Sequence, residues 1–229
     1  MTTIPYTLHY APDNASLVVR LALEELGQPY RTVLVDRRAN AQKSADYLAL
    51  NPNGLIPVLE TRQGPVFETA AILLWLVDEH KSLGPSTNDP MRADFLKWLF
   101  FLSNTLHPAL RCMFYADKYI GEATKDQAQL RDVTRQNIEK HLRVLEARWQ
   151  DARPLVLDLY LAPMLRWLAL YPKDTQRDWF NISDYPMLCA SASQLEARPS
   201  VLSASRAEGL GPRPFTVPQP PNPPEGSAL

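Results

Sequence analysis

Two short stretches decide the fold of this chain: Asn51-Pro52-Asn53-Gly54-Leu55-Ile56-Pro57-Val58-Leu59 and, soon after, Glu68-Thr69-Ala70-Ala71-Ile72. The first is dense in turn residues and leads into a β-rich run, where Pro57 cannot donate a ladder hydrogen bond. A cis bond at Pro57 would point the backbone N–H and C=O of Ile56 outward, where they could pair with an extended peptide. Only about 5–6% of X-Pro bonds are cis, so spacing alone does not establish this turn.

The residues around these stretches alternate between strand and helix patterns. Strands are predicted at 6–10, 30–35, 56–61 and 65–67, and helices at 16–26, 44–50 and 68–80. This order predicts a small α/β domain with a mixed sheet over residues 1–82. A linker rich in turn residues follows at 81–89.

The strand signal disappears after the linker, which predicts an all-α domain over residues 90–208. One long helix is expected from Pro90 to Lys118, with Asp89 as its N-cap. Further helices are expected at 126–150, 157–171, 186–197 and 199–207. The one at 157–171 is nearly all apolar and is predicted to be the buried central helix.

Residues 209–229 form a tail that is too rich in proline for regular helix or sheet. We expect it to be extended and mostly mobile, with Phe215 and Val217 as candidates to pack on the body. A proline-motif ligand for another protein is the alternative role.

Composition excludes several functions. The formal net charge of -1 argues against nucleic acid or an anionic membrane as partner, and no apolar run is long enough to span a bilayer. The start of the sequence lacks a basic and then apolar signal, so we expect a cytoplasmic protein. The two cysteines and four histidines show no ligand-like spacing, so no metal site is predicted.

Glu68 and Thr69 open the predicted helix at 68–80. The N-terminus of a helix offers free N–H groups and a positive dipole end, which suit a carboxylate, and the Glu68 side chain can hold an ammonium group. A site for both groups together suits a γ-glutamyl ligand. The alternative is a capped helix start that binds nothing.

The paired stretches resemble the glutathione-binding core of the cytosolic glutathione transferases. The resemblance covers about residues 6–208 and extends to Leu23-Glu24-Glu25-Leu26-Gly27 and Asp158-Leu159-Tyr160-Leu161-Ala162-Pro163. It implies a thioredoxin-like N-terminal domain, an all-helical C-terminal domain and a homodimer. It also implies glutathione as co-substrate, held by Asn53, Ile56, a cis Pro57, Glu68 and Thr69.

The segment from Tyr10 to Ser16 resembles the bacterial beta-type transferases, but Ala15 stands at their cysteine position. Alanine cannot donate a hydrogen bond to the thiol. Ser16 is therefore the first candidate for the thiolate donor, with Asn14 as the second. The alternative for Ser16 is a plain helix N-cap, and Tyr10 is interpreted as packing.

His107 is the third candidate, because a histidine lies at the corresponding place in the active-site cleft of beta-type enzymes. It shares a helical face with Phe100, Ser103, Arg111 and Phe114, and Pro108 should kink the helix. The alternative is a histidine satisfied between packed helices.

The resemblance favours an enzyme whose glutathione thiolate attacks a small electrophile. Two alternatives stay open, because fold alone cannot separate them. One is a glutathione-binding or protein-interaction module without transferase activity, and the other is a specialised glutathione-dependent lyase, dehalogenase or isomerase.

Overall fold

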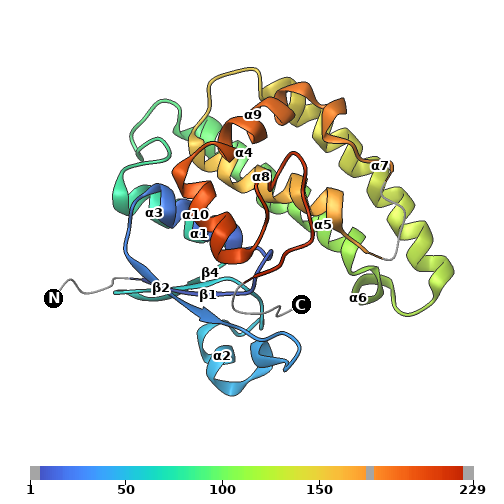
Figure 1. Cartoon of the computed structure of the whole chain (residues 1–229), viewed down its shortest axis with the longest axis horizontal. Coiled ribbons are helices and arrows are strands. Elements are labelled where there is room, and N and C mark those ends of the chain that lie inside the picture. The colour runs from blue at the N-terminus through green and yellow to red at the C-terminus, as the bar shows by residue number, and fades with distance from the viewer. Residues whose placement is uncertain (1–5, 174–177, 224–229) are drawn as a thin grey trace.

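The computed structural model describes residues 6–173 and 178–223 and shows a four-stranded sheet beside a larger helical part (Figure 1). The sheet order is β2-β1-β3-β4, with β1 parallel to β2 and antiparallel to β3, as the β-α-β-α-β-β-α pattern predicts. This is the thioredoxin-like arrangement that was expected. The strands are β1 (Tyr6–Tyr10), β2 (Tyr30–Leu34), β3 (Val58–Thr61) and β4 (Gly64–Phe67).

Helices lie on both faces of the sheet (Figure 1). Helices α1 (Ser16–Glu25) and α3 (Thr69–His80) pack between the sheet and the helical part, while α2 (Ala45–Leu50) lies on the opposite side with the short 3-10 helix η1 (Ala41–Lys43). A small separate core under α2 contains Tyr47 and Val58. This small core therefore supports the turn that precedes β3 from the α2 side of the sheet.

The predicted single helix from Pro90 to Lys118 is wrong. The chain instead forms α4 (Arg92–Phe101), a π-helical turn η2 (Leu102–Leu106), α5 (His107–Phe114) and α6 (Ala116–Ile120). Pro108 has no N–H and its ring crowds the preceding turn, so the i→i−4 ladder is interrupted one turn before it. A second break follows at Tyr115, whose φ of -126° is not helical.

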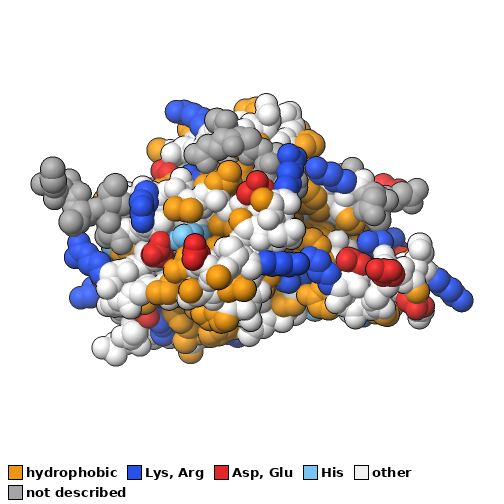
Figure 2. Space-filling view, turned by 90° about the horizontal axis from the view of Figure 1, so that it is seen from below, with side chains coloured by type: hydrophobic (Ala, Val, Ile, Leu, Met, Phe, Trp, Pro, Cys, Tyr) orange, Lys and Arg blue, Asp and Glu red, His pale blue; other side chains and the backbone are white. Residues whose placement is uncertain are grey.

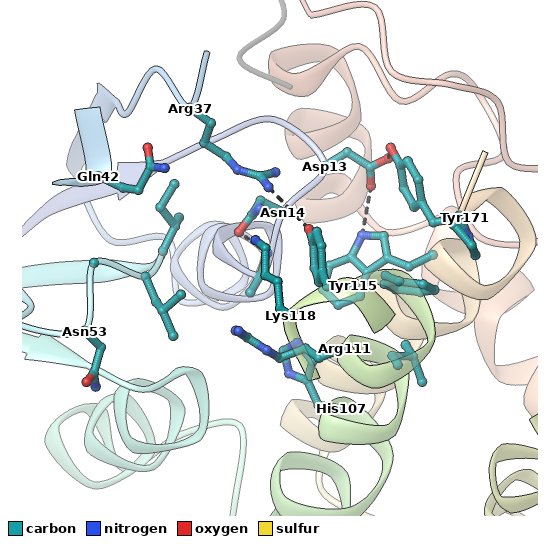
Figure 3. A pocket seen from close by; sticks show the side chains of 18 of the residues that line it. Asp13, Asn14, Arg37, Gln42, Asn53, His107, Arg111, Tyr115, Lys118 and Tyr171 are labelled. Atoms are coloured by element: carbon teal, nitrogen blue, oxygen red, sulfur yellow. Dashed lines mark hydrogen bonds between the residues drawn. The ribbon is translucent and has the colours of Figure 1, made fainter. Parts of the chain in front are cut away.

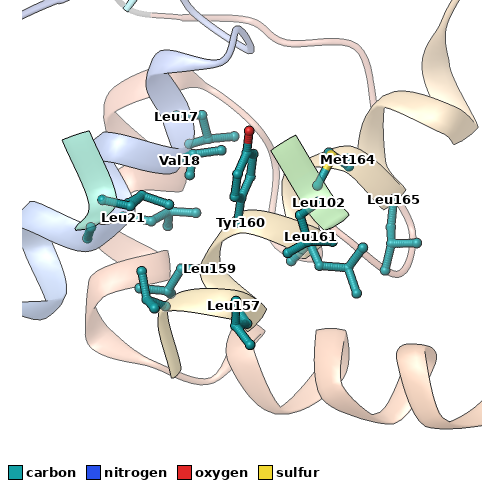
Figure 4. Close-up of a cluster of buried hydrophobic side chains, with 14 of the residues drawn as sticks. Leu17, Val18, Leu21, Leu102, Leu157, Leu159, Tyr160, Leu161, Met164 and Leu165 are labelled. Atoms are coloured by element: carbon teal, nitrogen blue, oxygen red, sulfur yellow. The ribbon is translucent and has the colours of Figure 1, made fainter. Parts of the chain in front are cut away.

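The remaining helices match the predicted ones to within one or two residues. Helix α8 is buried almost throughout, and Figure 4 shows Tyr160 beside Leu17 and Val18 of α1, and Leu161 near Leu102 of η2. Each fully buried leucine stabilises the fold by about 1.5–3 kcal/mol relative to exposure. The two domains thus share one continuous core. The helices are α7 (Thr124–Arg148), α8 (Leu155–Leu170), the 3-10 helix η3 (Ile182–Asp184), α9 (Pro186–Glu196) and α10 (Pro199–Glu208).

The tail from 209 to 223 is docked on the body, so the expectation of a mostly mobile tail is wrong for these residues. Phe215 is buried, and the Glu196 carboxylate accepts from the backbone N–H groups of Phe215 and Thr216 at 2.9 and 2.7 Å. Val217, the other predicted contact, is 51% exposed. Buried side chains supply the hydrogen-bond partners that proline-rich backbone cannot find in regular structure. Residues 224–229 of the predicted tail lie outside the described part.

In the described part of the chain, every helix is too short or too polar to cross a bilayer.

Candidate functional site

Two adjoining cavities lie between the sheet domain and the helical part. The α3-side cavity, which Glu68 and Thr69 line, has a volume of about 700 Å³, and the α6-side cavity, which Arg37 and Lys118 line, has a volume of about 600 Å³. The residues that line both are Ala15, Leu55, Ile56, His107 and Arg111. The cavities are therefore two ends of one cleft.

The α3-side cavity contains the turn before β3 and the first turn of α3. The Ile56–Pro57 bond is cis, and in the described residues we find no hydrogen-bond partner for the backbone N–H or C=O of Ile56. Glu68 precedes α3 with a φ of 68°, a region that residues other than glycine rarely adopt. Thr69, whose side chain is largely buried, begins the helix whose N-terminal N–H groups face this cavity. An amino-acid head group would find a positive helix end and a carboxylate side by side here.

The turn itself is held by buried side chains that the sequence interpretation missed. The Nδ2 of Asn51 and the hydroxyl of Tyr47 each donate to the Leu55 carbonyl at 2.8 Å, and the Oδ1 of Asn51 accepts from the N–H of Asn53 at 3.0 Å. These bonds fix the backbone that presents Ile56. Asn53, predicted as a glutathione contact together with Glu68 and Thr69, lies on the wall of the α6-side cavity.

At the N-terminus of α1 the structure separates the two candidate donors. Ser16 is fully buried, and its hydroxyl donates to the Ala11 carbonyl at 3.0 Å while accepting from the Ala11 N–H at 3.3 Å. It lines neither cavity, so the geometry does not support Ser16 as thiolate donor. It is not the N-cap either, because Ala15 holds that position. The hydroxyl closes the loop before α1 instead.

Asn14 lines the cleft together with Ala15 (Figure 3). Its Oδ1 accepts from the Ala15 N–H at 2.8 Å. Only the oxygen of the amide can accept, so this bond fixes the orientation of the side chain. We find no partner for Nδ2 in the described residues, which leaves Asn14 as a donor into the cleft.

His107 lines both cavities, as the resemblance implied, and it is also bonded between packed helices. Its Nδ1 lies 3.0 Å from the Tyr160 hydroxyl, and its ring is tilted against Trp167 with 5.7 Å between centroids. Burial, and next the charge of Arg111, lowers the pKa of His107 to about 4. Burial, with Glu68 second, raises the pKa of Tyr160. Both side chains are therefore uncharged at neutral pH.

The predicted shared face of this region is confirmed despite the π-helical turn. Phe100 and Ser103 line the α3-side cavity, Phe114 lines the α6-side cavity, and His107 and Arg111 line both. Tyr10, in contrast, is buried under Arg20 and serves packing, as interpreted.

Asp13 is the residue of this region that the sequence interpretation missed entirely. It has a φ of 52°, and its buried carboxylate accepts from Arg166, Trp167 and Tyr171, the last two at 2.9 Å (Figure 3). Its N–H donates to Glu208 at 2.8 Å. The loop that carries Asn14 is thus anchored to α8 and α10. An aspartate beside an asparagine in a loop gives no sequence signal for partners so far away along the chain.

Comparisons with known proteins agree with this architecture. Residues 15–79 match the family model described as "Glutathione S-transferase, N-terminal domain". A glutathione S-transferase of Xanthomonas campestris is 29% identical, and one of Escherichia coli O157:H7, GstA, is 27% identical; each alignment covers 89% of this chain and 98% of the relative. A glutathione transferase structure from Burkholderia graminis, solved with two glutathione molecules bound per subunit, has a TM-score of 0.76 at 26% identity, covering 88% of this chain and 87% of that one.

The sheet topology, the cis bond before β3 and these similarities together define the class of protein. The chain belongs to the glutathione transferase superfamily, because a glutathione S-transferase of Arabidopsis thaliana, F10, is 30% identical to it over 58% of this chain and 69% of that relative.

Proposed function

We propose that this protein binds glutathione in the cleft and activates its thiol for attack on a small electrophile. The observation that carries the proposal is the convergence of Ile56, Glu68 and Thr69 with Asn14 on one cleft. Similarity to relatives named glutathione S-transferase over nearly their whole length supports it.

In the proposed pose the γ-glutamyl group lies in the α3-side cavity. Its carboxylate accepts hydrogen bonds from the N-terminal N–H groups of α3 and from the Thr69 hydroxyl, and its ammonium group donates to the Glu68 carboxylate. The cysteinyl residue pairs with the free backbone groups of Ile56 in antiparallel fashion. The glycine carboxylate then extends into the α6-side cavity, where Asn53 and Lys43 line the wall. The thiol faces Asn14 and Ala15.

Thiol activation is assigned to Asn14 rather than to Ser16. A thiol with a pKa near 8.5 must drop by about two units to be mostly ionised at neutral pH, which requires about 2.7 kcal/mol. A hydrogen bond to a charged group supplies about 1.5–3 kcal/mol, and the N-terminus of α1 adds about 0.3–1 kcal/mol. One donor from Nδ2 of Asn14 and the helix end are therefore sufficient.

His107 acts as a neutral group in this scheme. With a pKa lowered to about 4 it carries no positive charge that could stabilise a thiolate at pH 7. The nearby cation is Arg111, which lines both cavities. We assign to His107 the positioning of ligand atoms where the two cavities meet, with Tyr160 holding its ring.

Ultraviolet absorbance of the bound thiolate against pH tests the proposal. The pKa of bound glutathione should lie well below that of free glutathione, and Asn14→Ala should raise it by one to two units (about 1.5–3 kcal/mol). Asn88→Ala, in the exposed linker, is the matched control and should leave it unchanged. Ser16→Ala should lower stability without moving this pKa.

The alternatives have their own signatures in the same experiment. Binding of glutathione without a lowered thiol pKa would favour a binding module, and no binding at millimolar glutathione would exclude every catalytic reading. A homodimer, a cytoplasmic location and nearness to the beta type stay predictions.

A further inference from the structure

The α6-side cavity is lined by more basic side chains than the carboxylates of glutathione can pair with. Its basic side chains come from both domains, and none of them has an ion-pair partner within residues 6–173 and 178–223. These side chains are Arg37, Lys43, Arg111, Lys118 and Lys173. The chain as a whole has a net charge of -1, so this concentration is local. Figure 2 shows Lys and Arg side chains lying next to apolar ones on the face seen from below.

The acidic residue in the cavity wall does not neutralise these cations. Asp13 lines the cavity, but its carboxylate is bonded to Arg166 at 2.8 and 3.0 Å. Burial cuts the pair off from solvent, since both side chains have no exposed surface. Among the described residues that line the cavity, Asp13 is the one acidic group, and it does not compensate the positive potential of the other basic groups.

Two cations from different segments of the chain contact the same aromatic side chain in the wall of the cavity. The Nη2 of Arg37 lies 3.3 Å from the Tyr115 hydroxyl, and the Nζ of Lys118, on α6, lies 4.5 Å from the centre of the same ring. Figure 3 shows both side chains, and that of Arg111, pointing into the cavity. Cationic groups that line one cavity attract an anionic ligand to it.

Glutathione accounts for only part of this charge. Of its two carboxylates, the proposed pose gives one to the N-terminus of α3 and leaves the glycine carboxylate for the α6-side cavity. Lys43, on the sheet-domain wall near Asn53, is placed to receive it. Four of the five basic side chains are left over, and two of them, Arg111 and Lys118, lie on the α5–α6 wall beside the aromatic side chains.

The floor beside these leftover cations is apolar and aromatic. Leu110, Phe114, Trp167 and Tyr171 line it, and the rings of Phe114 and Tyr171 meet edge to face at 6.1 Å. A ligand that suits this cavity has a flat apolar body and one anionic group at its edge.

We propose that the co-substrate is such an anion: an aromatic or conjugated electrophile whose carboxylate is held by Arg111 and Lys118. This rests on the proposed function. In the step tested, the thiolate sulfur forms a bond to a ring carbon that carries chlorine, and chloride leaves with the bonding electron pair. The thiol proton has already gone to solvent, so no other reactant is needed.

The experiment compares 4-chloro-3-nitrobenzoate with its neutral amide, 4-chloro-3-nitrobenzamide. Each kcat/KM is divided by the rate constant of the same compound with free glutathione, because the amide is the more reactive electrophile. Each partly exposed charge contact is worth about fivefold, so two contacts should give a preference for the benzoate of roughly 20-fold. The preference should shrink as ionic strength rises.

Three variants locate the effect. Lys118→Met and Arg111→Met should each lower the preference about fivefold. Lys140→Gln, on the exposed surface of α7, should keep the full preference. A wild-type preference near one, or a preference unchanged in both Lys118→Met and Arg111→Met, overturns the proposal.

Equilibrium binding separates this proposal from the function on which it rests. The unreactive 4-methyl-3-nitrobenzoate and its amide are titrated into glutathione-loaded protein by calorimetry. Glutathione binding with no discrimination between the two compounds overturns the anionic co-substrate alone, whereas absence of glutathione binding overturns the proposed function.

Discussion

Arg166 joins the loop before α1 to the C-terminal tail, and its replacement by methionine should destabilise the protein severely. The guanidinium group has no exposed surface and uses every N–H that it has. Two N–H groups bind the Asp13 carboxylate, and the others donate to the carbonyls of Leu210, Pro214 and Gln219. No other described side chain holds both segments.

The expected loss follows from what Arg166→Met leaves behind. Removing one partner of a buried ion pair typically costs about 3–5 kcal/mol, because the other charge stays buried without compensation. Protonating an ordinary aspartic acid side chain at pH 7 costs about 4 kcal/mol, which sets a ceiling on the part due to Asp13. The tail carbonyls can reach water if the tail detaches, so they add little. We expect a loss of about 3–5 kcal/mol, a large share of the 5–15 kcal/mol typical of a folded protein.

Urea denaturation followed by tryptophan fluorescence measures this loss. Lys97→Met, which breaks an ion pair on a lysine whose side chain is 61% exposed, is the matched control and should cost less than about 1 kcal/mol. The double variant Asp13→Asn, Arg166→Met should lose clearly less free energy of unfolding than the two single variants lose together. The reason is that the double variant leaves no buried charge without its partner. A loss below about 1 kcal/mol for Arg166→Met, or strict additivity in the double variant, would refute the reasoning.

Three further predictions concern the cleft and its support. Glu68→Gln should weaken glutathione binding about tenfold, which calorimetry measures, because it removes the charge that faces the ammonium group; unchanged affinity would contradict the pose. Burial raises the pKa of Glu208 to about 7, above its value of 4.5 in the unfolded chain. Between these two pH values the folded state binds more protons than the unfolded state. The free energy of unfolding should therefore fall by up to about 3 kcal/mol as the pH rises from 4.5 to 7. Glu208→Gln should remove this fall, and an unchanged slope would count against it. The lowered pKa of His107 acts in the opposite sense: it contributes stability that is present above pH 6.5 and is lost as the pH falls toward 4. His107→Asn should remove this contribution, which denaturation across this pH range measures.

The local sequence determined most elements of the fold, the long helix from Pro90 to Lys118 excepted, and one half of the candidate site. Alternating strand and helix patterns end close to the observed boundaries, because turn residues such as Gly27 and Asn53 stop each element locally. Ile56, Glu68 and Thr69 were predictable for a similar reason. Their proposed roles depend on the backbone of a turn and on the end of a helix, which are properties of a short segment.

Only the tertiary structure decided the other half of the site. Whether Ser16 or Asn14 faces the cleft depends on a hydroxyl bond to Ala11 that no spacing rule predicts. Asp13 meets Arg166 across most of the chain length, and Arg37 meets Lys118 at Tyr115 across the domain boundary. Packing brings these charges together, and burial then decides which are neutralised and which are left for a ligand. The sequence and its family resemblance indicated where glutathione is proposed to bind, and the fold decided which side chains face the proposed position of the thiol.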